Sequence, residues 1–328
     1  MLATASTDTT SSSVRLSPHR TNSRLFQRAP VLCLVSLVPL WVTAATFDLP
    51  PPEFDLVGAV EMVEALPEDT LLDVARRHDI GQEEIVRANP GVDRWLPGDG
   101  VNIIIPSRRI LPPPPREGLV LNLPEMRLYF FPEQQPGQTA RVQTYPVSIG
   151  RMDWATPLGH TTLVAKERDP AWRPPESIRR EHAEDGDPLP DVVPPGPLNP
   201  LGRYALRLGL PGYLIHGTNK AFGVGMRVSH GCIRMLPEDI ESLFPDIPVG
   251  TPVRIINQPA KAGWYGGELY LEIHPPLEED QVSRDALVEI VMAAIDEALL
   301  KRAARVSERE IEQAISRQDG LPVVVSKE

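Results

Sequence analysis

The chain has 328 residues, which at roughly 150 residues per domain predicts two folded domains with some sequence outside them. Its 33 Lys and Arg against 44 Asp and Glu give a formal net charge of −11, so it lacks the cationic excess with which proteins bind nucleic acids. The two cysteines, Cys33 and Cys232, exclude a disulfide framework and a multi-cysteine zinc site. Composition therefore indicates an acidic globular protein that does not bind nucleic acid.

Residues 1–45 have the pattern of an export signal. Four Arg and one Asp within residues 1–30 precede an apolar stretch from Val31 to Val42. That stretch is too short to cross about 30 Å of hydrocarbon as a helix, and the small residues after it suit a signal peptidase. We expect cleavage near Ala44 or Ala45 and no stable membrane span afterwards; the alternative is an uncleaved anchor. Cleavage would leave Cys232 as the single thiol.

Residues 58–107 predict a small β-α-α-β domain. Apolar side chains recur at helical spacing over 71–80, a second short helix over 83–88 precedes Asn-Pro-Gly, and 101–105 alternate like a strand. The segment resembles the LysM module at Asp69-Thr70-Leu71, Ala75, Asn89-Pro90, Leu96-Pro97-Gly98 and Ile105-Pro106. This resemblance implies binding of N-acetylglucosamine polymers such as peptidoglycan glycans. A spacer of the same shape without sugar affinity is the alternative.

A polyproline linker over 108–117 marks a domain boundary, because such a sequence is extended and stiff. Residues 118–257 beyond it alternate like strands, with one short helix near 237–244, and predict a mainly β domain. The proline-dense insert 169–200, which contains Trp172, interrupts this pattern. We interpret the insert as a lid or wall over a site, with a solvent loop as the alternative.

Residues 258–328 predict a hairpin that turns at Gly266-Gly267, followed by an amphipathic helix. The apolar stripe of this helix is expected to pack on the catalytic domain or on a partner. A membrane helix is disfavoured because the opposite face is charged.

Residues 215–235 hold the densest set of reactive side chains: His216, Ser229, His230, Cys232 and Arg234, separated by glycines. A cysteine nucleophile acts as thiolate and needs a nearby base or cation. His230 shares a face with Cys232 in an extended segment, whereas His216 reaches Cys232 only if the glycine-rich loop folds back. The alternatives are an inert buried thiol beside a core histidine, and zinc held by His216, His230 and Cys232.

The order H-G-T, spacer, S-H-G-C-I-R resembles the YkuD family of L,D-transpeptidases, and Thr156-Pro157-Leu158-Gly159 resembles that family's T-P-x-G turn. The domain order resembles the periplasmic branch often called ErfK/YbiS. The resemblance implies a mixed, β-sandwich-like catalytic domain beside the LysM-like domain and the C-terminal helical tail. It also implies a periplasmic location, a role in cell-wall synthesis and cell shape, and no metal or cofactor.

The resemblance further implies roles for individual residues. Cys232 would be the nucleophile, His216 the base and later the acid, and the Gly217 carbonyl would orient His216. Backbone N–H groups at Gly231 and Cys232 would bind the oxyanion. The loop would be shaped by Ser229, His230 and Arg234, and substrate would be held by Arg234, Arg227 and Trp172.

The implied reaction is acyl transfer. Cys232 attacks the carbonyl before the terminal D-alanine of a tetrapeptide stem and forms a thioester, which an amine then opens. The amine would belong to another stem, giving a 3-3 cross-link, or to a lysine of an outer-membrane lipoprotein, and carbapenems would acylate the thiol. The alternatives are a hydrolase or amidase that releases wall-bound lipoprotein and a catalytically silent LysM-type wall-binding protein.

Overall fold

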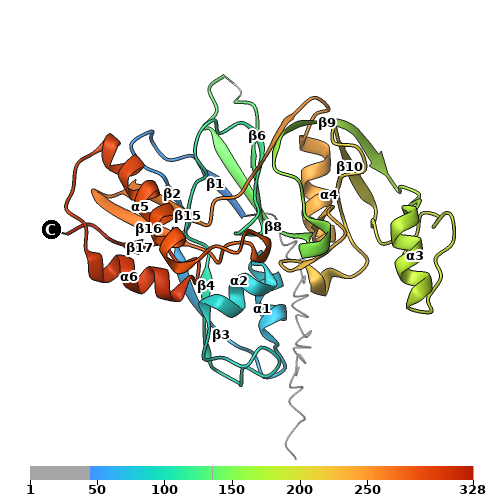
Figure 1. Ribbon diagram of the computed structural model, residues 1–328, viewed down its shortest axis with the longest axis horizontal. Coiled ribbons are helices and arrows are strands. Elements are labelled where there is room, and N and C mark those ends of the chain that lie inside the picture. The colour runs from blue at the N-terminus through green and yellow to red at the C-terminus, as the bar shows by residue number, and fades with distance from the viewer. Residues whose placement is uncertain (1–44, 135, 328) are drawn as a thin grey trace, which may run out of the picture. The chain divides into compact units, whose positions relative to one another are not determined.

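The computed structural model of the chain describes residues 45–134 and 136–327 (Figure 1). The expected export signal lies outside these residues, except for Ala45, which begins strand β1 (Ala45–Asp48). β1 pairs antiparallel with β8 (Arg141–Gly150), with Ala45 opposite Thr144. No helix within the two described ranges is long and apolar enough to cross a membrane.

The predicted β-rich domain consists of one sheet that closes on itself. Eight strands follow the order β8-β13-β11-β10-β9-β14-β6-β7, and β7 pairs again with β8. β8 closes the ring because residues 143–146 pair with β7 whereas residues 147–148 pair with β13. The remaining ring strands are β6 (Gly118–Asn122), β7 (Arg127–Phe131), β9 (Gly159–Arg168), β10 (Tyr204–Leu208), β11 (Leu214–His216), β13 (Ile233–Met235) and β14 (Pro252–Ile256). The expected β-sandwich-like arrangement is thus a barrel-like sheet, to which β12 (Arg227–Ser229) is added beside β8.

Alternating apolar side chains of these strands fill the inside of the ring. Leu119, Leu128, Tyr145 and Ile233 are fully buried in one cluster. The expected short helix is α4 (Pro237–Asp246), which begins with proline at its first position, where the missing N–H costs nothing. It adds Ile240 and Leu243 to the same cluster.

The β-α-α-β order predicted for 58–107 is confirmed. β3 (Val60–Glu64) and β4 (Asn102–Pro106) pair antiparallel, and α1 (Leu71–Arg77) and α2 (Gln82–Ala88) lie between them in the chain. Thr70 caps α1 by accepting from the Asp73 N–H, while the Asp73 carboxylate accepts from the Thr70 N–H. Apolar residues of all four elements form a separate core. We call this unit the βααβ module.

The proline-rich segment packs against the sheet. β5 (Arg109–Ile110) pairs with β2 (Leu56–Val57), and the guanidinium of Arg254 in β14 donates to the carbonyls of Pro113, Pro114 and Pro115. These contacts fix the path between the βααβ module and β6.

The C-terminal hairpin and helix are present as predicted, and two further elements accompany them. β15 (Ala260–Tyr265) and β16 (Glu268–Ile273) form the hairpin, to which β17 (Val323–Val324) adds a third strand. The stripe of α5 (Arg284–Lys301) packs with α6 (Glu308–Arg317) on this small sheet. The prediction that the apolar stripe of α5 packs on the catalytic domain or on a partner is therefore wrong, because the C-terminal hairpin covers this stripe.

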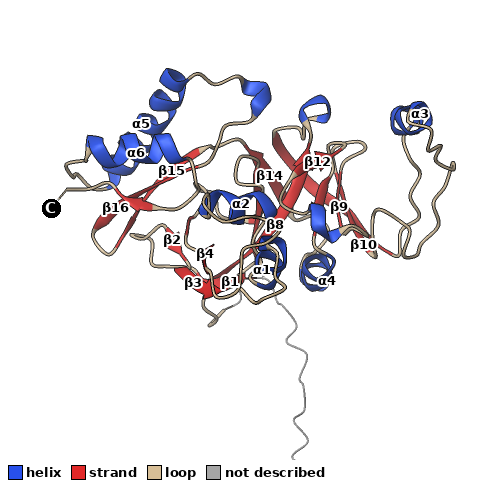
Figure 2. Cartoon of the chain, turned by 90° about the horizontal axis from the view of Figure 1, so that it is seen from below, coloured by secondary structure: helices blue, strands red, loops and turns tan. Residues whose placement is uncertain are grey.

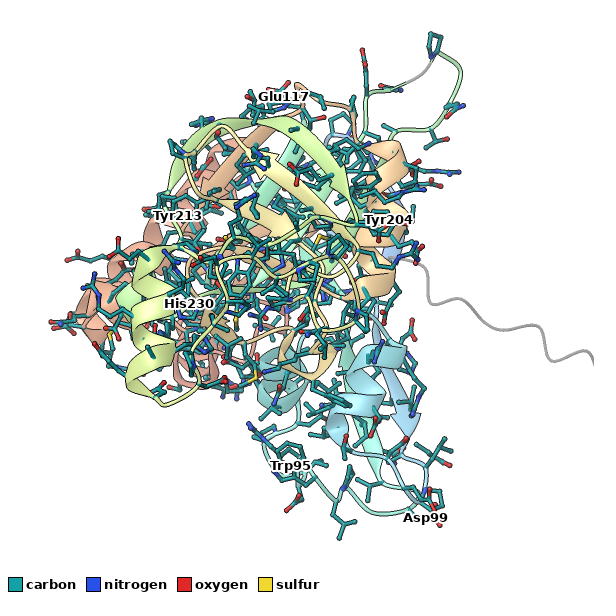
Figure 3. The ribbon with its side chains drawn as sticks, turned by 90° about the vertical axis from the view of Figure 1, so that its right-hand side faces the viewer. Trp95, Asp99, Glu117, Tyr204, Tyr213 and His230 are labelled. Atoms are coloured by element: carbon teal, nitrogen blue, oxygen red, sulfur yellow. The ribbon has the colours of Figure 1, made fainter. Side chains whose placement is uncertain are left out.

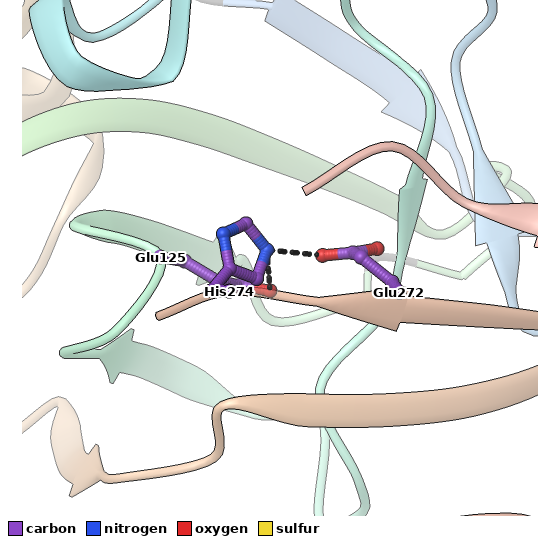
Figure 4. A group of neighbouring side chains, drawn as sticks. All are labelled: Glu125, Glu272 and His274. Atoms are coloured by element: carbon purple, nitrogen blue, oxygen red, sulfur yellow. Dashed lines mark hydrogen bonds and ion pairs between the residues drawn. The ribbon is translucent and has the colours of Figure 1, made fainter. Parts of the chain in front are cut away.

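A buried group of charges joins the C-terminal hairpin to the turn between β6 and β7 (Figure 4). His274 Nε2 lies 2.8 Å from Glu272 Oε1 and 3.8 Å from Glu125 Oε1. Lys261 pairs with both carboxylates and donates to the Ile110 carbonyl. The lysine thus supplies the positive charge that two buried acids require.

The insert 169–200 contains a helix that the sequence did not predict, α3 (Glu176–Glu184) (Figure 2). A bridge between Trp172 and Val193 closes the base of the insert. The fully buried Asn199 donates to the carbonyl of Pro170 and so ties the two ends of the insert together. Single 3-10 turns occur at η1 (Met152–Trp154), η2 (Ala221–Gly223) and η3 (Glu278–Asp280).

Candidate active site

The closed sheet brings His216 and the segment of Cys232 together. β11 and β13 are parallel neighbours, with Ile215 opposite Ile233 and His216 opposite Arg234. Cys232 directly precedes β13, so Cys232 and Arg234 share one face of the strand, the face that His216 also occupies. The loop between His216 and Cys232 therefore folds back, as the reaction requires.

His216 is held as a neutral imidazole. Its Nδ1 lies 2.6 Å from the Gly217 carbonyl oxygen, and because a carbonyl only accepts, Nδ1 carries the hydrogen. The Gly217 N–H donates to the Tyr204 carbonyl and fixes this peptide. Burial, and then the charge of Arg234, lower the pKa of His216 to about 4. Nε2 is consequently free of a proton at neutral pH and can act as a base.

Cys232 is partly buried, and its Sγ lies 3.6 Å from the Gly212 carbonyl oxygen. Burial raises the pKa of the thiol, while the backbone of Leu214 and the charge of Arg234 act in the opposite direction. The resting pair therefore consists of a neutral thiol and a neutral imidazole. Activation requires proton transfer as the substrate binds.

The peptide before the thiol is shaped by Gly231 and Thr156. Gly231 has a φ of +95°, and a Cβ there would approach the Tyr213 ring to 2.9 Å. The Thr156 hydroxyl donates to the Gly231 carbonyl at 2.9 Å and accepts from the Gly150 N–H at 3.0 Å. Ser229 Oγ donates to the Cys232 carbonyl from the other side. The T-P-L-G turn thus holds the peptide that precedes Cys232.

His230 connects this loop to the insert, near α3 in Figure 3. Its Nε2 lies 3.0 Å from Glu181 Oε2 in α3, and Glu181 also pairs with Arg151. The Trp154 ring meets the His230 ring edge-on, with 5.3 Å between the centroids. Sequence reasoning missed Glu181 and Arg151, because no local pattern relates Glu181 to His230, 49 positions away, or to Arg151, 30 positions away.

The three expected substrate-binding residues differ in their surroundings. Arg227 is already paired with Glu279 at 2.8 Å and donates weakly to the Gly150 carbonyl. Trp172 contributes a backbone bridge to Val193. Arg234 Nε is buried without a hydrogen-bond partner among the described residues. Arg227 Nη1 is likewise buried without such a partner, and of these two arginines Arg234 lies next to the thiol, two residues after Cys232.

The βααβ module contacts the loop between His216 and Cys232. The first two N–H groups of α2 donate to that loop: Gln82 N to the Val224 carbonyl at 3.2 Å, and Glu83 N to the Gly225 carbonyl at 3.1 Å. These donors have no partner inside the helix, so the loop serves as the helix cap. Gly225 has a φ of +87°, and a Cβ there would lie 2.2 Å from Gln82 N.

The three side chains of the zinc alternative do not converge in this structure. Among the described residues, the His, Cys, Asp and Glu side chains whose ligand atoms converge within 4.8 Å are Glu125, Glu272 and His274. His216, His230 and Cys232 form no such group. The convergent group contains the Lys261 ammonium, which already occupies its carboxylate oxygens.

Comparison with known proteins identifies the family of this chain. Residues 116–255 match the YkuD family, described as the L,D-transpeptidase catalytic domain. The chain is 38% identical over 299 residues to the probable L,D-transpeptidase ErfK/SrfK of Salmonella typhimurium, covering 89% of this chain and 94% of that protein. It is also 38% identical over 288 residues to the probable L,D-transpeptidase YbiS of Escherichia coli, covering 86% and 92%. The chain belongs to the L,D-transpeptidase family.

The similarity to these L,D-transpeptidases extends beyond the catalytic sheet, because it covers most of both chains. An L,D-transpeptidase crystal structure from Mycobacterium tuberculosis H37Rv shares 20% identity over 49% of this chain and 64% of that chain, with a TM-score of 0.31. The assignment rests on the sequence matches. The protein is an enzyme of the L,D-transpeptidase class, and His216 and Cys232 lie in the matched domain.

Proposed function

We propose that the enzyme transfers the acyl group of a peptidoglycan tetrapeptide stem through a thioester on Cys232. The observation that carries this proposal is the parallel pairing of β11 with β13, which sets a neutral His216 beside the strand that begins after Cys232. A buried neutral base next to a thiol is the arrangement that nucleophilic catalysis by cysteine needs.

In the first step His216 Nε2 takes the proton of the thiol as sulfur attacks the carbonyl carbon before D-alanine. The C–N bond then breaks, the D-alanine amine leaves with the proton from His216, and the thioester remains. An acceptor amine next attacks the thioester and gives a proton to His216. The new amide forms, and Cys232 leaves as thiolate and recovers the proton.

The surrounding groups support these steps. The Cys232 N–H, in the peptide whose carbonyl accepts from Thr156, and the Gly231 N–H before it would donate to the developing oxyanion. Arg234, with its unused Nε, would bind a substrate carboxylate. The insert around α3 would exclude water, because Glu181 anchors it to His230.

We further propose that the chain is exported to the periplasm, where peptidoglycan stems and outer-membrane lipoproteins are the available acceptors. The βααβ module would bind the glycan. Its support is the loop at the tip of the module, where Trp95 is 61% exposed and available for stacking on a sugar ring, with Asp99 in the same loop (Figure 3).

The test is incubation of the mature enzyme with tetrapeptide muropeptides, with and without a peptide that ends in the lysine of a lipoprotein, followed by mass analysis of the products. Cross-linked or peptide-linked stems are expected from the wild type and none from Cys232→Ala, with His160→Ala as an exposed histidine control. Full transfer activity in Cys232→Ala would overturn the mechanism, and free tripeptide as the main product would favour the hydrolase alternative.

A second test uses a carbapenem. Intact-protein mass spectrometry should show one covalent adduct on the mature wild type and none on Cys232→Ala. An adduct of equal yield on Cys232→Ala, or no adduct on the wild type, would contradict a nucleophilic Cys232.

A further inference from the structure

Two buried carboxyl groups that take no part in the proposed chemistry have no cation of their own. Asp79 follows α1 and is 3% exposed, and Asp239 in α4 is fully buried. No hydrogen-bond donor of the described residues reaches Asp79 Oδ1 or either carboxylate oxygen of Asp239. The remaining oxygen, Asp79 Oδ2, accepts from the backbone nitrogen of Ala45 at 3.0 Å.

The arginines near this pair are engaged elsewhere. Arg127 donates to Glu84 Oε2 at 2.9 Å, to Thr144 Oγ1 and to the Asp79 carbonyl, but not to the Asp79 carboxylate. Arg109 pairs with Glu84. Burial accordingly raises the pKa of Asp79 to about 6, and burial followed by the charge of Asp79 raises that of Asp239. Two adjacent buried acids without a dedicated positive charge are costly.

The geometry points to the missing cation being the amino terminus of the processed chain, produced by cleavage between Ala44 and Ala45. Signal peptidase adds water across that peptide bond: the carbonyl carbon keeps a hydroxyl as the carboxyl group of Ala44, and the Ala45 nitrogen becomes an amine that takes up a proton. The ammonium has three N–H donors where the peptide nitrogen has one. Three carboxyl oxygens of Asp79 and Asp239 accept from no described donor, so they would be available to the two additional N–H groups.

Little movement is needed for this contact. β1 is held against β8 along its whole length, from Ala45 opposite Thr144 to Asp48 opposite Arg141. The Ala45 nitrogen therefore stays beside Asp79 after cleavage. Of the two cleavage positions that the sequence allows, the one before Ala45 places the new charge on the carboxyl pair.

The ion pair would connect three parts of the molecule. β1 lies on the catalytic sheet, Asp79 belongs to the βααβ module, and Asp239 lies in α4, directly after the strand of Arg234. Processing would thus complete the contact between module and catalytic sheet, which makes it a maturation site. This inference rests on the proposed export of the chain.

The test compares two purified chains that differ only in their first residues: one begins at Ala45, released without extra residues from a cleavable fusion, and the other keeps Gly-Ser before Ala45. In urea unfolding at pH 7, the folding equilibrium constant of the Ala45 chain should be roughly tenfold larger than that of the Gly-Ser chain. This factor corresponds to a rise of one unit in the pKa of the amino group on folding. The stability difference should vanish in Asp79→Asn. It should persist in the matched control Asp48→Asn, which removes an exposed carboxylate from β1.

The pH dependence provides a check that needs no core substitution. An ion pair raises the pKa of the amino group in the folded state, so the advantage of the Ala45 chain is present below the unfolded pKa and is lost as the pH rises above about 9. Other titratable groups also face Asp79 and Asp239, and their effects on the pH dependence cancel because they are the same in both chains. These groups are Glu84, Arg109, Arg127, Tyr145 and Glu238.

Equal stability of the two chains, or a difference unchanged by Asp79→Asn and by high pH, would overturn the inference. Amino-terminal sequencing of the exported protein should give Ala45, and a start at Thr46 would also contradict it. Because both chains of the unfolding comparison are prepared without export, that comparison is independent of transpeptidase activity and of where the protein is located, whereas the sequencing also tests the proposed export.

Discussion

His216 lies directly opposite Arg234 in the parallel pair of β11 and β13. One guanidinium thereby acts on both members of the proposed catalytic pair. Its charge opposes protonation of His216 and favours the thiolate of Cys232, since it lowers the pKa of each. The arrangement keeps His216 unprotonated at neutral pH. Cys232 and His216 therefore do not form a thiolate–imidazolium ion pair before substrate binds.

Replacing Arg234 by Met should raise the pKa of the Cys232 thiol. The thiolate fraction at pH 8 then falls, and alkylation by iodoacetamide at that pH should slow by up to about tenfold, the factor for one pKa unit. The rate above the thiol pKa should change little. The exposed Arg203→Met is the control, and an alkylation profile of Arg234→Met that coincides with the wild type would refute the role of the charge.

His216 should make the enzyme sensitive to acid. Its pKa is about 4 in the folded state against 6.5 for the free side chain, so the unfolded chain takes up the proton first as the pH falls. Stability from the neutral imidazole is complete above pH 6.5 and is lost between 6.5 and 4. The stability difference between wild type and His216→Gln should shrink by up to about 3 kcal/mol over that range in urea titrations. Parallel pH curves for the two proteins would contradict this.

Glu181→Gln should loosen the insert from the catalytic loop. The variant loses the charge that pairs with His230 and Arg151, so water gains access to the thioester. We expect the ratio of transfer to hydrolysis to fall about threefold or more while the melting temperature is unchanged. Asp191→Asn, which removes the partner of Arg179 in the same insert, should leave the ratio as in the wild type. The same product ratio in all three proteins would mean that the insert does not control water.

Gln82→Pro tests whether the βααβ module positions the catalytic loop. Proline is tolerated at the first position of α2 but removes the N–H that donates to Val224. A displaced loop should lower kcat about tenfold with a short soluble stem, with KM unchanged because that substrate does not reach the module. Arg284→Pro makes the same change at the first position of α5 and should have no effect. A wild-type kcat in Gln82→Pro would show that the contact is only structural.

Lys261→Met should destabilise the fold, because Glu125 and Glu272 are then left buried beside His274 without the ammonium. Breaking a buried ion pair from one side costs about 3–5 kcal/mol. Denaturant unfolding measures the loss, with the exposed Lys220→Met as control. Adding Glu272→Gln should recover part of the stability, whereas strictly additive losses would mean that the two groups do not interact.

Local patterns predicted the enzyme class better than the architecture. Cys232 and His216 are separated by a glycine-containing loop of a recognisable sequence, so their proximity could be expected from the motif. The closed sheet depends on contacts between distant strands, such as β7 with β8 and β14 with β6, which no periodicity encodes. Register at such distances is set by the packed core rather than by neighbours in sequence.

The insert shows a second limit of prediction. α3 is mostly polar and buries one apolar residue, Ile178, so it has almost no apolar stripe and proline-rich segments surround it. Its role depends on Glu181, whose partners His230 and Arg151 come from other parts of the chain. Such a contact is visible only once the fold has placed the three residues together.

The closed sheet also limits how a peptide can be recognised. Each strand of the ring has a neighbour on both sides, so an extended stem peptide cannot bind by adding itself to the ring as one more strand. Recognition must then come from side chains and loop N–H groups around the thiol. Such a surface can accept stems that differ in backbone conformation and branching, which a strand-addition groove would reject.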